Sequence, residues 1–423
     1  MTLKELLKIL NIKCDFPNGK ITGIKTDSRK IKKGDIYIAL KGKKYNGNKF
    51  AIDAINNGAL ISIVDDDIEN DRCLKVDNTY DVLTKIGNYI RKKYNKPLIA
   101  ITGSNGKTTT KELISYILKD KYNVLYNKDN RNNIVGVSEI LFKINKKIDI
   151  IITELGSNHI GEIKELSTMC EPNFCIITNI GSSHLQYFKT KKNIFKEKLS
   201  IKDGMKNGKM FVNGDDEYLK KIDCYKCGTH SNNDLIAYNI VNNKDNITFN
   251  IKLDKEYKII FHNPATHFVT DILLAIATCL EFMDIKDIIK RISKFKLIEK
   301  RMTILSRNNN LIINDCYNSS YESFEAGLNY LKKLSGKKII IFGDILELGK
   351  YSKSIHKKIN KIIPNDIDVL KIGKYSKYIK GTHFNSIDEI KKYLKENKIT
   401  NSNIYIKGSR RMGLDEVVDF LSK

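Results

Sequence analysis

The run of residues with the clearest chemical meaning spans positions 101–109 and reads Ile-Thr-Gly-Ser-Asn-Gly-Lys-Thr-Thr. It follows an apolar segment typical of a buried strand and opens a helical pattern that extends to about Lys119. Glycines let backbone N–H groups turn toward phosphate oxygens, a lysine can reach the terminal phosphates, and a threonine hydroxyl suits Mg²⁺. We therefore predict a phosphate-binding loop whose contact residues are Gly103, Ser104, Asn105, Gly106, Lys107, Thr108 and Thr109.

One feature departs from the general pattern of phosphate loops. The Walker A spacing places its first glycine at position 101, where this chain has Ile101. The alternative interpretation is a glycine-containing turn before a helix that binds no ligand, because such a turn would have part of the same sequence. The strand before it and the Lys107-Thr108 pair that opens the helix favour phosphate binding.

Three segments of the chain would have to position this loop. Residues 1–96 hold short apolar runs at 36–40 and 60–64 and a helical stretch near 80–94, which ends before Pro97. Residues 97–300 alternate apolar runs at 97–102, 148–153 and 174–179 with helical patterns, which indicates a largely parallel sheet covered by helices. Residues 301–423 repeat the alternation at 338–342, 368–372 and 404–407, as in a small doubly wound domain. We predict an α/β protein with domains at 1–96, 97–300 and 301–423.

The composition is that of a globular protein, with 41% hydrophobic and 29% charged residues. The 74 Lys and Arg against 49 Asp and Glu leave a net charge of +25. The lysines are spread through every segment instead of forming one basic stripe with interleaved aromatic residues, which argues against a nucleic-acid partner. The positive potential would still attract a phosphate-rich substrate.

The N-terminal residues, the length of the apolar runs and the cysteines indicate the cellular compartment. Leucines between Leu3 and Leu10 stand at helical spacing with charges between them, which predicts a folded helix and not a signal peptide. No uncharged apolar run approaches the roughly 20 residues of a spanning helix. Eight cysteines, from Cys14 to Cys316, are too sparse for a disulfide framework, and Cys224 and Cys227 lack a second pair for metal. We expect plain thiols in a cytoplasmic protein without membrane insertion.

The compact run Thr-Gly-Ser-Asn-Gly-Lys-Thr-Thr resembles the phosphate loop of the Mur ligases and the folylpolyglutamate synthetases. Other stretches are similar to the Mur ligase family in the expected order over essentially the full length, at 26–29, 42–50, 154–156, 179–184, 314–318, 342–349 and 406–412. The resemblance implies a three-domain architecture. A small N-terminal α/β domain would bind the UDP part of the substrate, a central P-loop domain would bind ATP, and a Rossmann-like domain would follow.

The resemblance also implies a site with two Mg²⁺ ions. Thr108 and Glu154 stand where the family binds the first ion, and His184 where a histidine approaches the second. Lys198, fourteen residues beyond His184, is similar in spacing to the family's carbamylated lysine, although Lys196 is a neighbouring candidate. A neutral amine that captures CO₂ becomes an anion and an oxygen ligand suited to Mg²⁺. The expected catalytic residues are Lys107, Glu154, His184, Lys198 and Arg301.

Further positions are expected to contact ATP. Arg301 resembles the arginine that opens the family's C-terminal domain and reaches over the ATP phosphates. Asp315 would hold the ribose, with Tyr317 and Asn318 beside it. Asp271 stands where the family has an asparagine that contacts adenine, so recognition of the base departs from the family pattern.

In the first domain, Ser28, Arg29 and Asn46 are expected to hold the UDP part of the substrate. A polar turn before a strand would have a similar sequence without binding a substrate, so this assignment depends on the rest of the resemblance. Asn46 stands where the family usually has Asp, and residues 319–321, Ser-Ser-Tyr, replace Ala-Asn-Pro.

Three stretches resemble the branch of the family that adds D-alanyl-D-alanine. They are the Tyr317-Asn318 pair, residues 342–349 with His356 after them, and residues 406–412. The resemblance implies a monomeric, ATP-dependent ligase that joins D-alanyl-D-alanine to UDP-N-acetylmuramoyl-tripeptide through an acyl phosphate, in peptidoglycan synthesis. The group that deprotonates the amine is not identified by the sequence.

Three other readings stay open at this point. The first is a ligase of the same chemistry that adds a different amino acid or extends folates. The second is a P-loop relative that binds a nucleotide without catalysis, which the departures above would allow. The third, nucleic-acid binding, depends on net charge alone.

Overall fold

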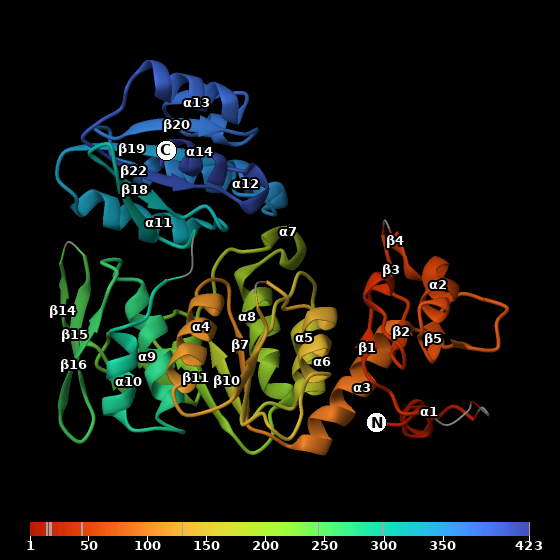
Figure 1. Ribbon diagram of the computed structural model, residues 1–423. Coiled ribbons are helices and arrows are strands. Elements are labelled where there is room, and N and C mark those ends of the chain that lie inside the picture. Colours follow the sequence, from red (N-terminus) through yellow and green to blue (C-terminus); the bar gives the residue numbers. More distant parts are fainter. Residues whose placement is uncertain are drawn as a thin grey trace.

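The apolar runs of the sequence become strands of parallel sheets in the computed structural model, which describes residues 1–13, 16, 19–43, 45–128, 130–243, 245–297 and 300–422. The predicted thiol of Cys14 lies outside these residues. The chain forms three α/β units (Figure 1). The structure thus confirms the predicted α/β class with a mostly parallel central sheet.

The N-terminal unit is a four-stranded parallel sheet with two helices. The sheet has the order β1-β2-β5-β6. Its strands are β1 (Ile24–Lys25), β2 (Ile36–Ile38), β5 (Ile61–Val64) and β6 (Cys73–Lys75). Helix α1 (Leu3–Leu10) buries its leucines as predicted and begins at a capping box between Thr2 and Glu5. Helix α2 (Ala51–Asn56) and the short hairpin β3 (Lys41–Gly42) and β4 (Tyr45–Asn46) complete the unit.

Helix α3 (Thr79–Tyr94) connects the first unit to the second. Its buried Arg91 donates hydrogen bonds to the backbone oxygens of Cys170 (2.8 Å) and Glu171 (3.1 Å), both in the central unit. The helix also contacts α1, with Lys93 Nζ 3.7 Å from Glu5 Oε1. Because α3 packs on both units, the domain bound at residue 96 stays a prediction.

The central unit is built on a seven-stranded parallel sheet in the order β13-β12-β11-β10-β7-β9-β8. The strands are β7 (Leu98–Thr102), β8 (Val124–Tyr126), β9 (Ile150–Glu154), β10 (Phe174–Ile177), β11 (Lys209–Asn213), β12 (Tyr225–Gly228) and β13 (Leu235–Ile236). The helices are α4 (Lys107–Leu118), α5 (Ile134–Leu141), α6 (Glu162–Cys170), α7 (Leu185–Phe188), α8 (Lys191–Leu199), α9 (Phe268–Cys279) and α10 (Ile285–Ile292). An antiparallel sheet of β14 (Tyr238–Asn242), β15 (Ile247–Lys252) and β16 (Glu256–Phe261) flanks them.

The C-terminal unit has a six-stranded sheet in the order β17-β18-β22-β19-β20-β21, parallel except for the β17-β18 pair. The strands are β17 (Thr303–Arg307), β18 (Asn310–Asn314), β19 (Lys337–Gly343), β20 (Asp368–Ile372), β21 (Thr382–Phe384) and β22 (Ser402–Lys407). The helices are α11 (Tyr321–Lys333), α12 (Ser352–Ile362), α13 (Ile387–Glu396) and α14 (Asp415–Leu421). This is the doubly wound arrangement that the strand-helix alternation predicted.

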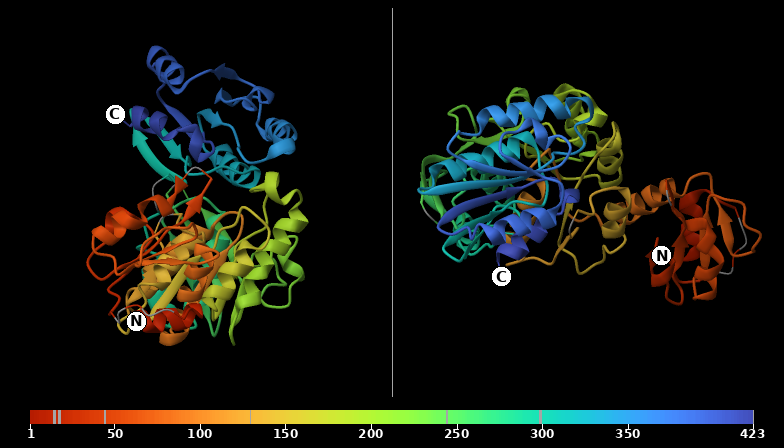
Figure 2. Two further views of the ribbon diagram at one scale, coloured as in Figure 1. Left: turned by 90° about the vertical axis from the view of Figure 1, so that its right-hand side faces the viewer. Right: turned by 90° about the horizontal axis from the view of Figure 1, so that it is seen from above.

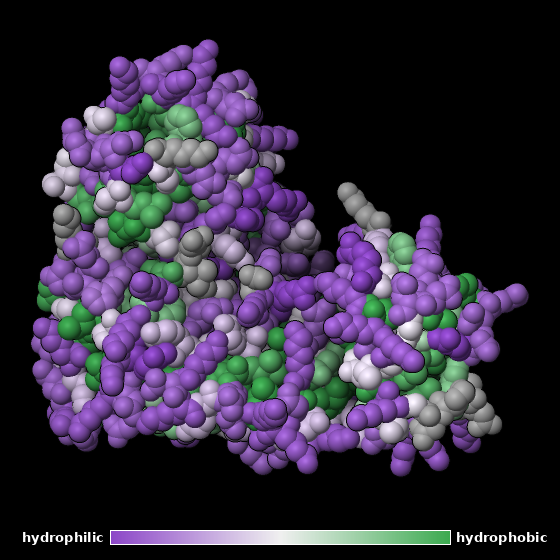
Figure 3. All heavy atoms as spheres, in the orientation of Figure 1, coloured by the Kyte–Doolittle hydropathy of each residue, from purple (hydrophilic) through white to green (hydrophobic). Residues whose placement is uncertain are grey.

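The C-terminal unit sits on the central unit, whereas the N-terminal unit stands to one side, as Figure 1 and the right-hand view of Figure 2 show. A hollow separates the N-terminal and C-terminal units in Figure 3, and the surface around it is mostly hydrophilic. Among the described helices, none is both long and apolar enough to cross a membrane. The seven cysteines of the described residues are free thiols.

Candidate active site

A cavity of about 910 Å³ lies where the C-terminal unit meets the central unit. It opens at the carboxyl ends of β7, β9 and β10, which is where open α/β sheets bind their ligands. Most of the residues predicted for the active site line it: Ser104, Asn105, Gly106, Lys107, Thr108, Thr109, Glu154, His184, Lys198, Asp271, Arg301, Asp315, Tyr317 and Asn318. The fold therefore brings together side chains that are up to about two hundred residues apart in sequence.

The phosphate loop turns from β7 into α4. Gly103 (φ 142°) and Gly106 (φ 80°) adopt backbone conformations that L side chains rarely take, so glycine is needed at both positions. The Lys107 ammonium folds back over the loop and donates hydrogen bonds to the backbone oxygens of Gly103 (2.9 Å) and Ser104 (3.3 Å). Burial lowers the pKa of Lys107, with the Glu154 carboxylate opposing that shift. The positive end of α4 and this ammonium make the loop a site for anions.

Glu154, at the end of β9, is held through both carboxylate oxygens. Thr108 Oγ1 donates a hydrogen bond to Oε2 (2.8 Å), and Asn132 Nδ2 donates one to Oε1 (2.8 Å). The sequence prediction paired Thr108 with Glu154 but missed Asn132. Asn132 lies in the loop between β8 and α5, which is rich in asparagines, and this composition is the sequence feature that could have pointed to it. The carboxylate is therefore fixed next to the phosphate loop.

Lys198 lies on α8 with 3% of its surface exposed, and its ammonium donates a hydrogen bond to Ser157 Oγ (2.9 Å). Burial, aided by the Lys107 charge, lowers the pKa of Lys198 to about 7. The alternative, Lys196, is exposed and does not line the cavity. With a pKa of about 7, Lys198 has a substantial neutral fraction near neutral pH.

His184 precedes α7 and contacts the C-terminal unit. Its Nδ1 lies 2.6 Å from Glu347 Oε2, and Arg411 Nη2 lies 3.3 Å from the other oxygen of that carboxylate. The contact with the His184 ring holds the pKa of Glu347 below its usual value. Glu347 belongs to the family-like stretch at 342–349, but it was not among the predicted site residues.

Arg301 reaches from the C-terminal unit to the phosphate loop. Its Nη2 donates a hydrogen bond to Thr108 Oγ1 (3.0 Å), and its guanidinium carbon lies 3.8 Å from the centre of the Tyr317 ring. The residues on either side, Lys300 (φ 67°) and Met302 (φ 53°), have left-handed backbones. The ring therefore supports the cation, and the turned backbone directs it at the loop.

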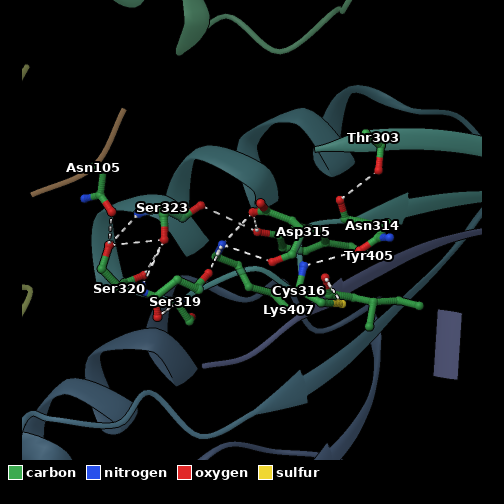
Figure 4. A network of polar contacts seen from close by, with 12 residues as sticks. Asn105, Thr303, Asn314, Asp315, Cys316, Ser319, Ser320, Ser323, Tyr405 and Lys407 are labelled. Carbon is green, nitrogen blue, oxygen red and sulfur yellow. Dashed lines mark hydrogen bonds and ion pairs between the residues drawn. The ribbon is translucent and has the colours of Figure 1, made fainter. Parts of the chain in front are cut away.

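Asp315 forms a buried polar network at the end of β18 (Figure 4). Its Oδ2 accepts hydrogen bonds from Lys407 Nζ (2.5 Å) and Tyr405 OH (3.2 Å). Lys407 also donates to the backbone oxygen of Asn318 (2.9 Å). The predicted ribose contact of Asp315 would have to be made by a carboxylate already paired with a buried lysine, and it stays a prediction.

The substituted stretch at 319–321 still touches the phosphate loop. Ser320 caps α11, and its Oγ donates a hydrogen bond to Asn105 Oδ1 (3.2 Å; Figure 4). Two residues later, Glu322 accepts hydrogen bonds from the backbone N–H (3.1 Å) and hydroxyl (2.7 Å) of Ser182. Glu322 was also missed, because only the fold brings α11 to the loop after β10.

Asp271, on α9, is packed against the phosphate loop. A Cβ atom added at Gly106 would lie 2.4 Å from Asp271 Oδ1, so the carboxyl leaves no room for a side chain there. Burial raises the pKa of Asp271 to about 8, against the opposing effects of Thr110 and Arg301. At neutral pH the group is therefore mostly the neutral acid, with one donor and one acceptor like an amide.

We predict that Asp271→Asn leaves the KM for ATP within about threefold of the original at pH 7, because an amide reproduces the donor and acceptor of the neutral acid. Since the raised pKa keeps the acid neutral below about pH 8, its negative charge develops only above that pH. The KM of the unmodified enzyme should then rise between pH 8 and 9.5, while that of the variant stays flatter. Parallel pH profiles of KM would contradict this account.

A second cavity, of about 650 Å³, lies in the N-terminal unit and is lined by Ser28 and Arg29, whose contact with UDP stays a prediction. Tyr45 and Phe50, which the sequence analysis did not single out, also line it, with their rings stacked at 5.7 Å. Asn46 does not line this cavity.

The side chain of Asn46 is engaged within the unit. Its Nδ2 donates a hydrogen bond to Asp66 Oδ2 (2.8 Å), and its Oδ1 accepts one from Asn48 Nδ2 (2.8 Å). These contacts hold the turn beside Tyr45. Arg29 is also paired, because its Nε lies 2.9 Å from Asp27 Oδ1.

The fold and these two cavities define a nucleotide-binding enzyme of three α/β units. Its residues 20–122 match the catalytic domain of the Mur ligase family, residues 101–279 the Mur ligase middle domain, and residues 300–405 the Mur ligase glutamate ligase domain. The chain belongs to the Mur ligase family.

Similar proteins match over nearly the whole chain. The UDP-N-acetylmuramoyl-tripeptide–D-alanyl-D-alanine ligase of Bacillus subtilis is 31% identical over 98% of this chain and 96% of its own length. The ligase of the same name from Buchnera aphidicola is 34% identical, over 95% and 93%. A crystal structure of MurF from Acinetobacter baumannii superposes with a TM-score of 0.91 at 26% identity, covering 100% of this chain and 99% of that one.

Proposed function

We propose that this enzyme uses ATP to join D-alanyl-D-alanine to UDP-N-acetylmuramoyl-tripeptide. The observation that carries the proposal is the cavity in which Lys107 of the phosphate loop and Arg301 of the C-terminal unit converge beside Glu154. The names of the relatives that match it end to end support the choice of substrates. The chain acts as a monomer in this proposal, with domains at 1–96, 97–300 and 301–423.

The phosphates of ATP would bind at the start of α4. Lys107 would exchange its two backbone acceptors for phosphate oxygens, and Arg301 would approach from the opposite unit. Asp271 lies beside the loop, and Asp315, Tyr317 and Asn318 line the far side, where the ribose and base would lie. Both cations would stabilise the charge that develops on the transferred phosphoryl group.

The donors beside the phosphate loop fit Mg²⁺. Thr108 and Glu154 offer oxygen atoms, and Mg²⁺ is typically bound by one or two carboxylates together with substrate phosphates and water. The described residues hold no cluster of three or more His, Cys, Asp or Glu side chains that could bind a metal by themselves. His184 and a carbamylated Lys198 would hold a second ion. The metal would supply charge neutralisation and a template for the phosphoryl oxygens.

Carbamylation of Lys198 is supported by its surroundings. A neutral amine is needed to attack CO₂, and burial holds the pKa of Lys198 at about 7. The product carbamate would be an anion facing a cavity rich in cations, where Lys107 and Arg301 lie. It would also replace a buried ammonium that repels Lys107.

The reaction then has two steps. The tripeptide carboxylate attacks the γ-phosphorus of ATP, the bond to ADP breaks, and an acyl phosphate forms. The amine of D-alanyl-D-alanine attacks the acyl carbon, loses a proton, and inorganic phosphate leaves with the amide formed. Arg301 and Lys107 would stabilise both the departing ADP oxygen and the later oxyanion.

The UDP end of the substrate would bind in the N-terminal cavity. The stacked Tyr45 and Phe50 offer an aromatic face to the uracil ring, and Ser28 and Arg29 offer polar groups to the diphosphate. The hollow in Figure 3 lies between the N-terminal unit, which holds this cavity, and the C-terminal unit, which contributes to the cavity at the phosphate loop. Movement of the N-terminal unit toward the C-terminal unit would bring the muramoyl peptide to the reacting centre and exclude water.

The amine specificity can be tested with a panel of acceptors. With ATP, Mg²⁺ and UDP-N-acetylmuramoyl-tripeptide present, ADP formation should require D-alanyl-D-alanine and should stay near background with D-alanine, L-lysine, meso-diaminopimelate or L-glutamate. ADP formation with one of the single amino acids and none with the dipeptide would show a ligase of the same chemistry with another substrate. ATP binding without turnover for any acceptor would favour a non-catalytic relative.

A further inference from the structure

Two residues that face each other across the interface of the central and C-terminal units share an uncommon backbone conformation. His184 (φ 58°) and Glu347 (φ 63°) are both left-handed although neither is glycine. Such conformations are infrequent in non-glycine residues and persist where the surrounding structure fixes them, often at functional sites. Each residue belongs to a loop that lines the cavity.

The contacts between the two loops involve both side chain and backbone. His184 Nδ1 lies 2.6 Å from Glu347 Oε2, so the ring and the carboxylate are in direct contact across the interface. The backbone oxygen of Glu347 also accepts a hydrogen bond from the N–H of Gln186 (3.0 Å). The Glu347 loop is thus locked to the His184 loop at two points.

The loop that carries Glu347 is rigidly supported from inside the C-terminal unit. The N–H of Ile345 donates to His356 Nε2 (3.2 Å), and the N–H of Leu346 donates to Ser409 Oγ (2.9 Å). His356 is fully buried, with its Nδ1 2.7 Å from the backbone oxygen of Ser352. The position of the Glu347 carboxylate therefore follows the position of the whole C-terminal unit.

We propose that Glu347 is a positioning residue that orients the His184 imidazole when the C-terminal unit is seated on the central unit. With Nδ1 held against the Glu347 carboxylate, Nε2 is the ring nitrogen that remains for the cavity. When the C-terminal unit moves away, the carboxylate leaves with it and the ring loses its fixed orientation. Docking of the C-terminal unit is thereby coupled to completion of the active site. This inference rests on the proposed ligase function.

The first test compares Glu347→Gln with the unmodified enzyme under saturating substrates. We expect kcat to fall by about 10-fold or more, because partners that orient a functional histidine typically contribute 10- to 100-fold, while the KM for ATP changes less than about threefold. Lys191→Gln is the matched control, since Lys191 pairs with Glu322 (2.9 Å) across the same interface without touching His184. The control should keep kcat within about twofold.

The second test is a double-mutant cycle with His184→Asn. If Glu347 acts through His184, the kcat of the double variant should be no lower than the kcat of the less active single variant. The inference would be overturned if the losses in kcat of the two single variants multiply in the double variant. It would also be overturned if Glu347→Gln leaves kcat unchanged, or if Glu347→Gln and Lys191→Gln lower kcat equally. An unmodified enzyme that forms no amide product would instead overturn the proposed function.

Discussion

Replacing Lys107 by alanine is expected to lower the rate of ATP-dependent amide formation by about 10²-fold or more, as for the loss of one charge-stabilising group at a phosphoryl or acyl transfer site. The ammonium lies over the phosphate loop, where it donates a hydrogen bond to the Gly103 oxygen at 2.9 Å. Rates should be measured as ADP formation with saturating substrates. ATP affinity should be measured separately, because the loss combines binding and chemistry.

Two further variants make this result interpretable. Lys107→Arg keeps the charge but not the compact ammonium, so we expect it to recover only part of the loss. Lys143→Ala, at an exposed position outside the cavity, should retain full activity. A Lys107→Ala enzyme that forms product at the original rate would show that this loop does not serve phosphoryl transfer.

Replacing Lys198 by alanine is the second change with a large expected effect. The substitution removes both the buried amine and any carbamate formed from it, so we expect a loss of about 10²-fold or more in product formation. A small carboxylate such as formate should restore part of the activity, because it can occupy the vacated volume and supply the missing anion. The matched control is Lys196→Ala, whose side chain is exposed, and its activity should be unchanged. Full activity in Lys198→Ala would contradict the assignment.

The same residue predicts a dependence on pH and CO₂. The pKa of Lys198 is lowered to about 7, so the amine is mostly neutral above that pH and mostly protonated below it. Carbamylation, and with it activity, should therefore fall as the pH drops below about 7. Enzyme prepared in CO₂-free buffer at pH 6.5 should regain activity when bicarbonate is added at pH 8, and unmodified enzyme that shows no such recovery would argue against carbamylation.

Much of the fold could be predicted because it depends on local patterns. The apolar runs at 97–102, 148–153 and 174–179 correspond to β7, β9 and β10 with shifts of one or two residues at their ends. The phosphate loop could be predicted for the same reason, since Gly103, Gly106 and Lys107 act within a few residues of one another.

The supporting residues of the site could not be predicted in this way. Asn132, Glu322 and Glu347 reach the cavity from a loop, a helix and a distant strand end, so their contacts depend on how units pack and not on sequence spacing. The substrate contact expected of Asn46 from its family-like stretch stays a prediction, and the structure shows its amide bonded to Asp66 and Asn48. A polar residue in a turn can cap that turn as readily as it can bind a ligand.

The most direct test of the central claim is phosphate release with ATP, Mg²⁺, UDP-N-acetylmuramoyl-tripeptide and D-alanyl-D-alanine, with each component omitted in turn and the product identified by mass. The account predicts that rapid release requires all four components and that the product is the UDP-N-acetylmuramoyl-pentapeptide. Release that does not need the dipeptide, or a failure to form the pentapeptide despite bound ATP, would contradict it.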